Sequence, residues 1–435
     1  MKIKTKLYFP LALFALAAVA CVKNPGNGGD GGSTPGSVKE LTIPEGFAWK
    51  TTSDIACNFT SAHDVKVYVS TTENGGAFAS FIAGPDVEKV TLSVPAHTEK
   101  LYVKYETASG LSSAVPLSVA AGQVTYAVPA DAKQYVAVSA ASDSYEVKTA
   151  GAPAVNYDGA IYYPAVENGW GTLMFEDLWP SYGDYDFNDM VVNYKIQLYT
   201  QNKNKVRYMM VGFRIKAMGG SLPYELYLKM HGVKGGEIAS IELLSYKNLS
   251  VEPQMLHLNP GNPVKDPAIF QFKGIRENPN KPAGSTYLNT EPSKEMEDKD
   301  LAEVVFFVEF RNSIANEDVA LDLFDFFIAK PSDVVAGELK EIHGGEFKAT
   351  ELGEQTYWKL GGESIYTNKN RSYYYSATNL VWMLNVPSDI PHAYETVDFT
   401  KAYPNFASWA QSGGTQNKDW YENKPGNRVS SNLVK

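Results

Sequence analysis

The sequence predicts a mainly β protein, with a small N-terminal antiparallel β-sandwich followed by a larger β-rich domain of jelly-roll-like or sandwich type and few short helices. Two observations predict this fold class. Short segments in which apolar and polar residues alternate recur along the chain, and turns rich in Gly, Pro, Asn and Asp separate them. Signals for helices are few, and the clearest predicts one short helix over Phe399 to Gln411.

The first twenty residues have the layout of a secretory signal peptide. Three lysines precede an apolar run, Leu7 to Ala20, that is too short to span a bilayer as a mature helix. The small residues at its end lead directly to Cys21, and this arrangement resembles a bacterial lipobox, with Ala18 where Leu is more usual. The resemblance implies cleavage after residue 20 and a lipid, such as palmitate, on Cys21. The alternative is a plain signal peptide that leaves Cys21 as a free thiol.

Residues 21–40 read as a flexible tether, because the Gly, Asn, Pro and Ser between Val22 and Ser37 offer almost no apolar surface to bury. A lipid anchor and a tether belong together, since the acyl chains hold the membrane and the spacer lifts the domains away from it. We therefore expect an outer-membrane lipoprotein of the cell envelope, surface-exposed or periplasmic, whose contact with the membrane is the lipid on Cys21.

The balance of charge limits the classes of partner. The formal net charge is −10, and it becomes −13 once residues 1–20 are removed, because they carry three lysines and no acid. An acidic chain without a basic run is a poor partner for nucleic acid and a better one for cations. With Cys21 lipidated, Cys57 has no cysteine to pair with, and its apolar, strand-like surroundings predict a buried side chain.

The length of the mature chain, about 400 residues, predicts two domains or more. Residues 41–130 carry short alternating strands at Val65–Val69, Val90–Val94 and Leu101–Tyr105, which predict a sandwich of immunoglobulin-like type. Residues 131–155, rich in Ala, Ser and Asp, are predicted to connect it to the second domain.

The larger domain is predicted over residues 156–435. Its strands are longer, and loops rich in Pro, Asn and Gly, notably residues 259–300, separate them. The segments predicted as strands are Asp189–Tyr199, Val206–Ala217, Glu303–Arg311 and Leu321–Ala329.

An acidic stretch at the start of this domain is its most informative feature. Asp184, Asp186, Asn188 and Asp189 lie within six residues, and Asp177 lies shortly upstream. Crowded carboxylates repel one another and are costly to desolvate unless a cation or hydrogen-bond donors compensate. Oxygen ligands at i, i+2 and i+4 are those a calcium loop uses, since Ca²⁺ accepts six to eight oxygens in loose geometry. We therefore predict a Ca²⁺ site formed by these five residues.

The acidic loop is not an EF-hand. The sixth position holds Asp189 where an EF-hand needs Gly, the twelfth holds Lys195 where it needs Glu, and a strand follows instead of a helix. Two alternatives to a calcium site stay open. The loop can be a turn in which Asp and Asn side chains bond nearby backbone amides, or its carboxylates can take part in catalysis.

Four segments stand in order along residues 156–425. They are Gly171 to Val192 with the acidic stretch, Glu341-Ile342-His343, Asn379 to Pro387, and Ala402 to Ala410 followed by Asp419-Trp420-Tyr421. Together they resemble the LruC domain family of bacterial exported proteins and lipoproteins. Gly344-Gly345 stands where that family more often has Leu-Pro, so this loop is expected to differ. The resemblance implies the domain and an exported setting, but it implies no activity, since none is established for the family.

Glu341 and His343 form a second candidate cluster. They are two residues apart, so their side chains share one face if the segment is extended. A histidine beside carboxylates can ligate a transition metal or act as a base, and the alternative is an exposed pair on a strand. The chain contains no nucleophile elbow, phosphate loop or dinucleotide fingerprint.

Aromatic residues concentrate toward the C-terminal end of the chain. They can form a core, as aromatic residues in β proteins usually do, or a stacking surface for sugars. The residues concerned are Tyr373, Tyr374, Tyr375, Trp382, Trp409, Trp420 and Tyr421.

The function expected from these features is that of a noncatalytic, calcium-stabilised binding or adhesion module for a glycan or a protein. One alternative is a cell-surface hydrolase of polysaccharide or peptide, which requires Glu341, His343 and the acidic loop to meet in a cleft. A second is a structural subunit of a surface assembly, which predicts a donated strand or an open groove.

Overall fold

The computed structural model describes residues 36–85, 89–137, 155–166, 169–258, 261–331, 340–353, 371–372 and 374–434. The predicted signal peptide, Cys21, most of the tether and most of the connector lie outside these residues. Pro35–Lys435 form one compact unit. In the part of the chain that is described, no helix is both long and apolar enough to cross a membrane.

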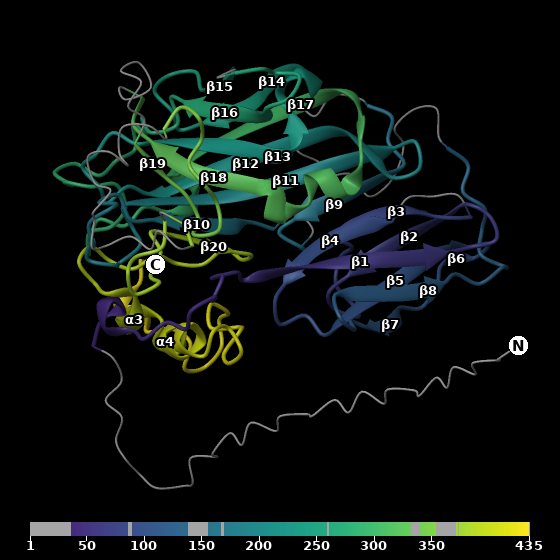
Figure 1. Cartoon of the computed structure of the whole chain (residues 1–435), viewed down its shortest axis with the longest axis horizontal. Helices are drawn as coiled ribbons and strands as arrows, with labels where there is room; N and C mark the ends of the chain where they lie inside the picture. The colour runs from purple at the N-terminus through teal and green to yellow at the C-terminus, as the bar shows by residue number, and fades with distance from the viewer. Residues whose placement is uncertain are drawn as a thin grey trace, which may run out of the picture. The chain divides into compact units, whose positions relative to one another are not determined.

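Strands dominate the described residues, and the mainly β fold class is confirmed (Figure 1). The strands of the N-terminal part are β1 (Thr52–Thr60), β2 (Val65–Ser70), β3 (Ala79–Ala83), β4 (Val90–Pro95), β5 (Lys100–Thr107), β6 (Gly110–Leu111), β7 (Val115–Ser118) and β8 (Gln123–Ala127). The strands that follow are β9 (Gly159–Tyr163), β10 (Gly171–Phe175), β11 (Met190–Gln201), β12 (Lys205–Ala217), β13 (Glu225–Lys234), β14 (Ile238–Lys247), β15 (Gln254–Leu258), β16 (Pro267–Lys273), β17 (Ala302–Ile314), β18 (Phe324–Ala329), β19 (Glu341–Ile342) and β20 (Met383–Val386). Within the described residues, α3 (Phe399–Ala402) and α4 (Pro404–Gln411) are α-helices.

The N-terminal part is a small sandwich. Its sheet β4-β1-β8 packs on the sheet that contains β3, β2 and β5. Strand β1 alternates, so Ile55, Cys57 and Phe59 face the core and Phe59 contacts the ring of Phe81 at 5.3 Å. Strand β8 pairs with β1 in parallel, a detail that the expectation of a purely antiparallel sandwich missed. Cys57 is buried as predicted, and burial raises the pKa of its thiol to about 12.

The larger part is also built from two facing sheets. One has the order β14-β17-β12-β11-β9 and the other has the order β15-β16-β13-β18-β19. Aromatic rings join them across the core: Phe213 lies 4.6 Å from Phe272, and Tyr194 lies 5.3 Å from Phe326. Strand β10 extends the first sheet beside β11 and carries β20 on its other edge, which places the loop after β10 at the end of the sandwich.

A single sheet continues from the larger part into the smaller one. Strand β9 meets β3 at Ala79 and Ile161, and Tyr162 N–H donates to Phe78 O at 2.8 Å. The side chain of Asn204 continues this pairing in place of a backbone strand. It accepts from Ile82 N–H and donates to Ile82 O, both at 2.8 Å. These contacts connect the two parts through backbone pairing, whereas the division at residues 131–155 stays a prediction.

Most of the long strands lie where they were predicted, within one to three residues at each end. The expected Leu321–Ala329 strand begins at Phe324, after a 3-10 turn over Leu321–Leu323. Two predictions were wrong in detail. Residues 259–300 contain β16 as well as loops. The helix expected over Phe399 to Gln411 is two short helices, because Pro404 lacks the N–H that a continuous helix needs.

An N-terminal arm, residues 38–49, packs on these C-terminal helices, as the purple and yellow segments of Figure 1 show. Phe47 meets Trp409 edge to face at 5.0 Å, and Trp49 donates from its ring N–H to Asn379 O at 2.9 Å. Val38 is buried and its N–H donates to Asp398 at 2.9 Å. The tether therefore ends before Val38, earlier than the predicted residue 40.

Candidate metal centre

The acidic loop after β10 is wrapped around the carboxylate of Glu176. This side chain is fully buried, and its two oxygens accept from Phe187 N–H at 2.7 Å and from Tyr185 N–H at 3.1 Å. Tyr185 and Phe187 have positive φ angles of 60° and 54°, which bulky residues rarely adopt. Their rings are buried in the core, and Asp186 lies between them in the sequence. Glu176 therefore holds the acidic stretch in a strained, defined shape.

Three carboxylates meet at this loop. One oxygen from each of Glu176, Asp184 and Asp186 lies within 4.8 Å of the others, a spacing that suits a shared metal ion. Asp186 is buried and accepts from Asn188 N–H at 3.0 Å and from Thr396 N–H at 2.8 Å. Asp184 is exposed, so the cluster reaches solvent on its side.

Two further oxygens face one small space beside Gly219. A Cβ atom on Gly219 would lie 2.0 Å from Asn188 Oδ1 and 2.8 Å from Glu395 Oε2, so only glycine fits there. Neither oxygen has a hydrogen-bond partner in the part of the chain that the structure describes, although both atoms are buried. Asn188 is oriented by its amide nitrogen, which donates to Ala393 O at 3.2 Å. Its carbonyl oxygen thus faces the space beside Glu395 Oε2 without a donor of its own.

Asp177 and Asp189 complete the acidic cluster. Asp189 accepts from Asp177 N–H at 2.7 Å, which holds the two residues side by side. A Cβ atom on Gly220 would lie 2.3 Å from Asp177 Oδ2 and 3.3 Å from Asp189 Cβ. The adjacent glycines 219 and 220 therefore give the chain room to pass close to the acidic side chains.

Burial and mutual repulsion disfavour the charged forms of the carboxyl groups in this cluster. Burial, and then repulsion from Asp184, raises the pKa of Asp186 to about 9 and that of Glu395 to about 7. Burial and the neighbouring Asp177 raise the pKa of Asp189 to about 8. The pKa of Glu176 is raised well above its ordinary value by burial and by the aspartates around it.

These six carboxylates have no basic partner in direct contact. Across the described residues, none of them forms an ion pair with Lys, Arg or His. At neutral pH the cluster must therefore hold protons or a cation. The donor set consists of oxygens alone, which suits a hard ion such as Ca²⁺ better than a transition metal.

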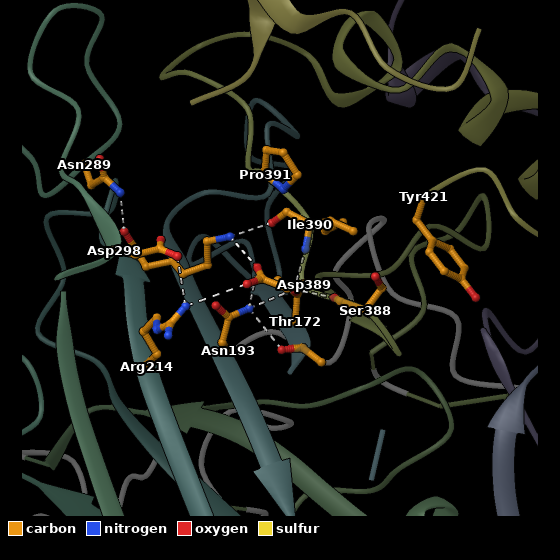
Figure 2. A network of polar contacts seen from close by, with 12 residues as sticks. Thr172, Asn193, Arg214, Asn289, Asp298, Ser388, Asp389, Ile390, Pro391 and Tyr421 are labelled. Atoms are coloured by element: carbon orange, nitrogen blue, oxygen red, sulfur yellow. Dashed lines mark hydrogen bonds and ion pairs between the residues drawn. The ribbon is translucent and has the colours of Figure 1, made fainter. Parts of the chain in front are cut away.

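The segment that brings Glu395 to the cluster is fixed by a polar network around Asp389 (Figure 2). Asp389 accepts from Lys216 at 2.7 Å and from Asn193 at 3.2 Å, both on the central strands. Thr172 donates to Ser388 O at 2.7 Å. Beyond the network, Glu395 N–H donates to Thr290 O at 3.0 Å. The segment before Glu395 is therefore fixed to the central strands, and Glu395 itself is fixed to the loop at Thr290.

The family model described as "Domain of unknown function (DUF4842)" matches residues 204–421, half of the chain. The chain belongs to the DUF4842 family. The match contains Glu341, His343 and Glu395 but begins after the acidic loop.

A solved structure resembles this DUF4842 protein over most of its length. It is the crystal structure of a "Putative lipoprotein from Bacteroides ovatus", with a TM-score of 0.61 and 22% identity. The alignment covers 85% of this chain and 98% of that one. At this identity the likeness establishes a shared fold. No curated protein matches the chain.

The five predicted ligands of the DUF4842 protein lie in one neighbourhood, and their binding of metal stays a prediction. Asp184 and Asp186 are brought together directly, and Asp189 and Asp177 are joined by a hydrogen bond. The sequence prediction missed Glu395, which lies about two hundred residues downstream without a local pattern to mark it.

Glu341 and His343 lie in a closed ionic network. His343 is fully buried, with Nδ1 2.9 Å from both oxygens of Asp325 and Nε2 3.0 Å from Glu341 Oε2. Burial alone would lower the pKa of His343, but the two carboxylates overcome it and raise the pKa to about 9. Both ring nitrogens then donate, which leaves no lone pair for a metal or a proton. The alternative of an exposed strand pair is wrong, since both residues are buried.

The C-terminal aromatic residues form core rather than a sugar-stacking surface. Trp382, Trp409 and Trp420 are each at most 1% exposed, and Trp409 and Trp420 lie 5.5 Å apart. Tyr374, Tyr375 and Tyr421 are equally buried, and Tyr373 lies outside the described residues. The surface alternative is therefore wrong for every ring of this group that is described.

Proposed function

We propose that this DUF4842 protein is a lipoprotein of the outer membrane, anchored through lipid on Cys21, whose folded part is a noncatalytic binding module stabilised by Ca²⁺. The anchor is supported by the lipobox-like end of the signal peptide and by the tether that follows it. The similar fold of the Bacteroides ovatus protein and the ordered segments that resemble the LruC family support the exported setting.

One observation carries the calcium part of the proposal. Asn188 Oδ1 is buried, lacks a hydrogen-bond donor within the described residues, and shares a space with Glu395 Oε2 beside carboxylates that lack basic partners. A self-satisfied turn would leave no such oxygen, because its amides would be the donors. A cation with six to eight oxygen ligands satisfies these oxygens and offsets the repulsion.

The ion would have a structural role. It would join the acidic loop, the turn at Gly219 and the segment from Ala393 to Thr396, which are far apart in the sequence. Asp186 and Asn188 already contact that last segment through backbone atoms. Calcium binding would therefore add its free energy to the stability of the larger part.

The hydrolase alternative gains no support from the described residues. It requires an accessible base, whereas His343 is buried and its ring nitrogens are both occupied by carboxylates. The noncatalytic module is therefore the function that the geometry favours.

The test compares thermal unfolding of the wild type and of a variant with Asp184→Ala and Asp186→Ala, in chelator and in about 1 mM CaCl2, a level that fills extracellular calcium modules. Calcium should raise the melting temperature of the wild type by several degrees and leave the variant unchanged. The matched control carries Glu297→Ala and Asp298→Ala, which remove two carboxylates with side chains more than 70% exposed, and it should respond as the wild type does. A wild type that ignores calcium removes the metal from the proposal.

The anchor is tested separately. Cys21→Ala should move the protein from the membrane fraction to the soluble fraction and abolish labelling by a palmitate analogue. Unchanged membrane association of this variant would contradict the anchor and leave the calcium site untouched.

A further inference from the structure

A second site of interest is a cavity between the N-terminal arm and the larger part. Its volume is about 110 Å³, and it lies where residues 48–52, at the end of the arm and the start of β1, pass the turn Leu321–Phe324, the loop 344–347 and strand β20. Ligand pockets for drug-sized molecules measure roughly 300–1,000 Å³, so this cavity suits one small ring or a chain end. None of its lining residues belongs to the acidic cluster.

Two glycines line the cavity. A Cβ atom on Gly345 would lie 2.5 Å from the ring of Tyr375, and one on Gly344 would lie 3.3 Å from Met383 Sδ. Larger side chains there would fill the space or displace its wall.

The floor of the cavity is apolar and its rim is charged. Trp49, Phe324 and Met383 are buried below, and the half-buried ring of Phe347 stands at the side. At the rim, Lys50 Nζ lies 2.7 Å from Asp322 Oδ2, and both side chains keep part of their surface exposed, at 47% and 26%.

The charges at the rim disfavour ionic ligands of either sign. The carboxylates of Asp322, Asp54 and Glu346 all act on Lys50 and would repel an anion. The ammonium of Lys50, and Arg371 at 3.1 Å from Glu346, would repel a cation. A neutral ligand with hydroxyl groups remains, because it can accept from Lys50 and donate to Asp322 while its C–H face packs on the rings below.

We propose that this cavity binds one ring of a neutral saccharide. The proposal rests on the noncatalytic binding role stated above and names the ligand class and the place of binding. Lys50 and Asp322 present a donor and an acceptor side by side, as two neighbouring hydroxyls of a sugar require. Phe347, which stacks on His231 with one face, supplies the stacking surface with the other.

The experiment uses the full mature chain and the methyl glycosides of glucose, galactose, mannose and N-acetylglucosamine. Saturation-transfer NMR identifies a sugar that binds. Titration calorimetry then measures its dissociation constant, which should be about millimolar because a single ring makes few contacts. Asp322→Ala and Phe347→Ala should each weaken binding about tenfold or more. Asp419→Ala, which breaks another half-exposed Lys–Asp pair at 2.6 Å, should bind as the wild type does.

Each outcome decides the proposal. Binding that both cavity variants lose, with unchanged melting temperatures, supports it. Absence of binding by every glycoside at about 10 mM overturns it, as does binding that both variants retain. Capture of a peptide by the cavity, lost in the same variants, would also overturn the saccharide assignment. A calcium-dependent melting temperature without sugar binding would leave the calcium module standing and remove this inference alone.

Discussion

Two groups of buried carboxylates lie in the larger part of this molecule, and they differ in what balances their charge. Asp325 and Glu341 hold His343 between them, so their countercharge comes from the chain itself. The acidic cluster around Asp186 has no such partner among the described residues. The first group is therefore complete within the chain, whereas the second must hold protons or a cation from outside at neutral pH.

The largest expected effect comes from removing the internal countercharge. His343→Leu removes the cation that Asp325 and Glu341 share, leaving Asp325 with the partly exposed His231 at 3.4 Å, and should lower the free energy of unfolding by about 3–5 kcal/mol. Urea denaturation measures it. His97→Leu is the control, because His97 pairs with Glu422 at the surface and its loss should cost less than about 1 kcal/mol. A loss below 1 kcal/mol at His343 would show that the network is not ionic.

The acidic cluster should make the metal-free protein less stable as the pH rises. The folded state keeps protons on Asp186, Asp189 and Glu395 up to pH values of about 9, 8 and 7, whereas the unfolded chain loses them near pH 4. The resulting stability is complete below pH 4 and is lost as the pH rises through the folded values.

Calcium should separate the two groups in the same experiment. Urea midpoints in chelator should fall between pH 5 and 9, and saturating calcium should remove most of that fall. The stability due to His343 is present below about pH 6.5 and is lost as the pH passes about 9, with or without calcium. If the urea midpoints fall with pH equally in chelator and in calcium, the acidic cluster does not take its countercharge from calcium.

Glu395 is a proposed calcium ligand that the sequence did not reveal, and its role can be tested by itself. Glu395→Gln keeps the shape and removes the charge, so the calcium dissociation constant should rise about tenfold, which corresponds to about 1.4 kcal/mol. Calorimetric titration measures it, and the control Glu297→Gln alters an exposed carboxylate. Affinity within twofold of the wild type would place the ion away from Gly219.

The smallest expected effect is the change in stability caused by Asp184→Asn, which should have opposite signs without and with calcium. Asp184 is exposed and repels the buried carboxylates, so Asp184→Asn should stabilise the metal-free protein at pH 8 by about 0.5–1 kcal/mol. In calcium the same change should destabilise the protein, since a ligand is lost. The control Asp131→Asn, at another exposed site, should do neither. One sign in both conditions would argue against a shared ion.

The strands were predictable because period-two alternation is a local property. The segment predicted at Val206–Ala217 matches β12 almost residue for residue. The meeting of β3 with β9 was not predictable, since a single pair, Ala79 and Ile161, joins segments about eighty residues apart. Register between distant strands depends on tertiary packing, which no local pattern encodes.

In the candidate site too, the residues marked by a local pattern were predictable and those brought in by tertiary packing were not. Spacing brought Asp184, Asp186 and Asn188 to notice, because a loop can present alternate residues to one ion. Glu395 and Asp325 escaped notice, since each reaches its cluster only through the folding of another segment. Burial also excluded the exposed strand pair that the sequence left open for Glu341 and His343. The neighbours of His343 in the sequence gave no sign of the carboxylate of Asp325 on β18.

The arm at residues 38–49 has a consequence for the order in which the protein matures. Its rings pack on Trp409 and Phe406, so the arm can dock only after the last tenth of the chain has been synthesised. Until then Phe47 and Trp49 would be exposed to solvent. A chaperone that binds apolar segments would find its target there, and docking of the arm would end that requirement.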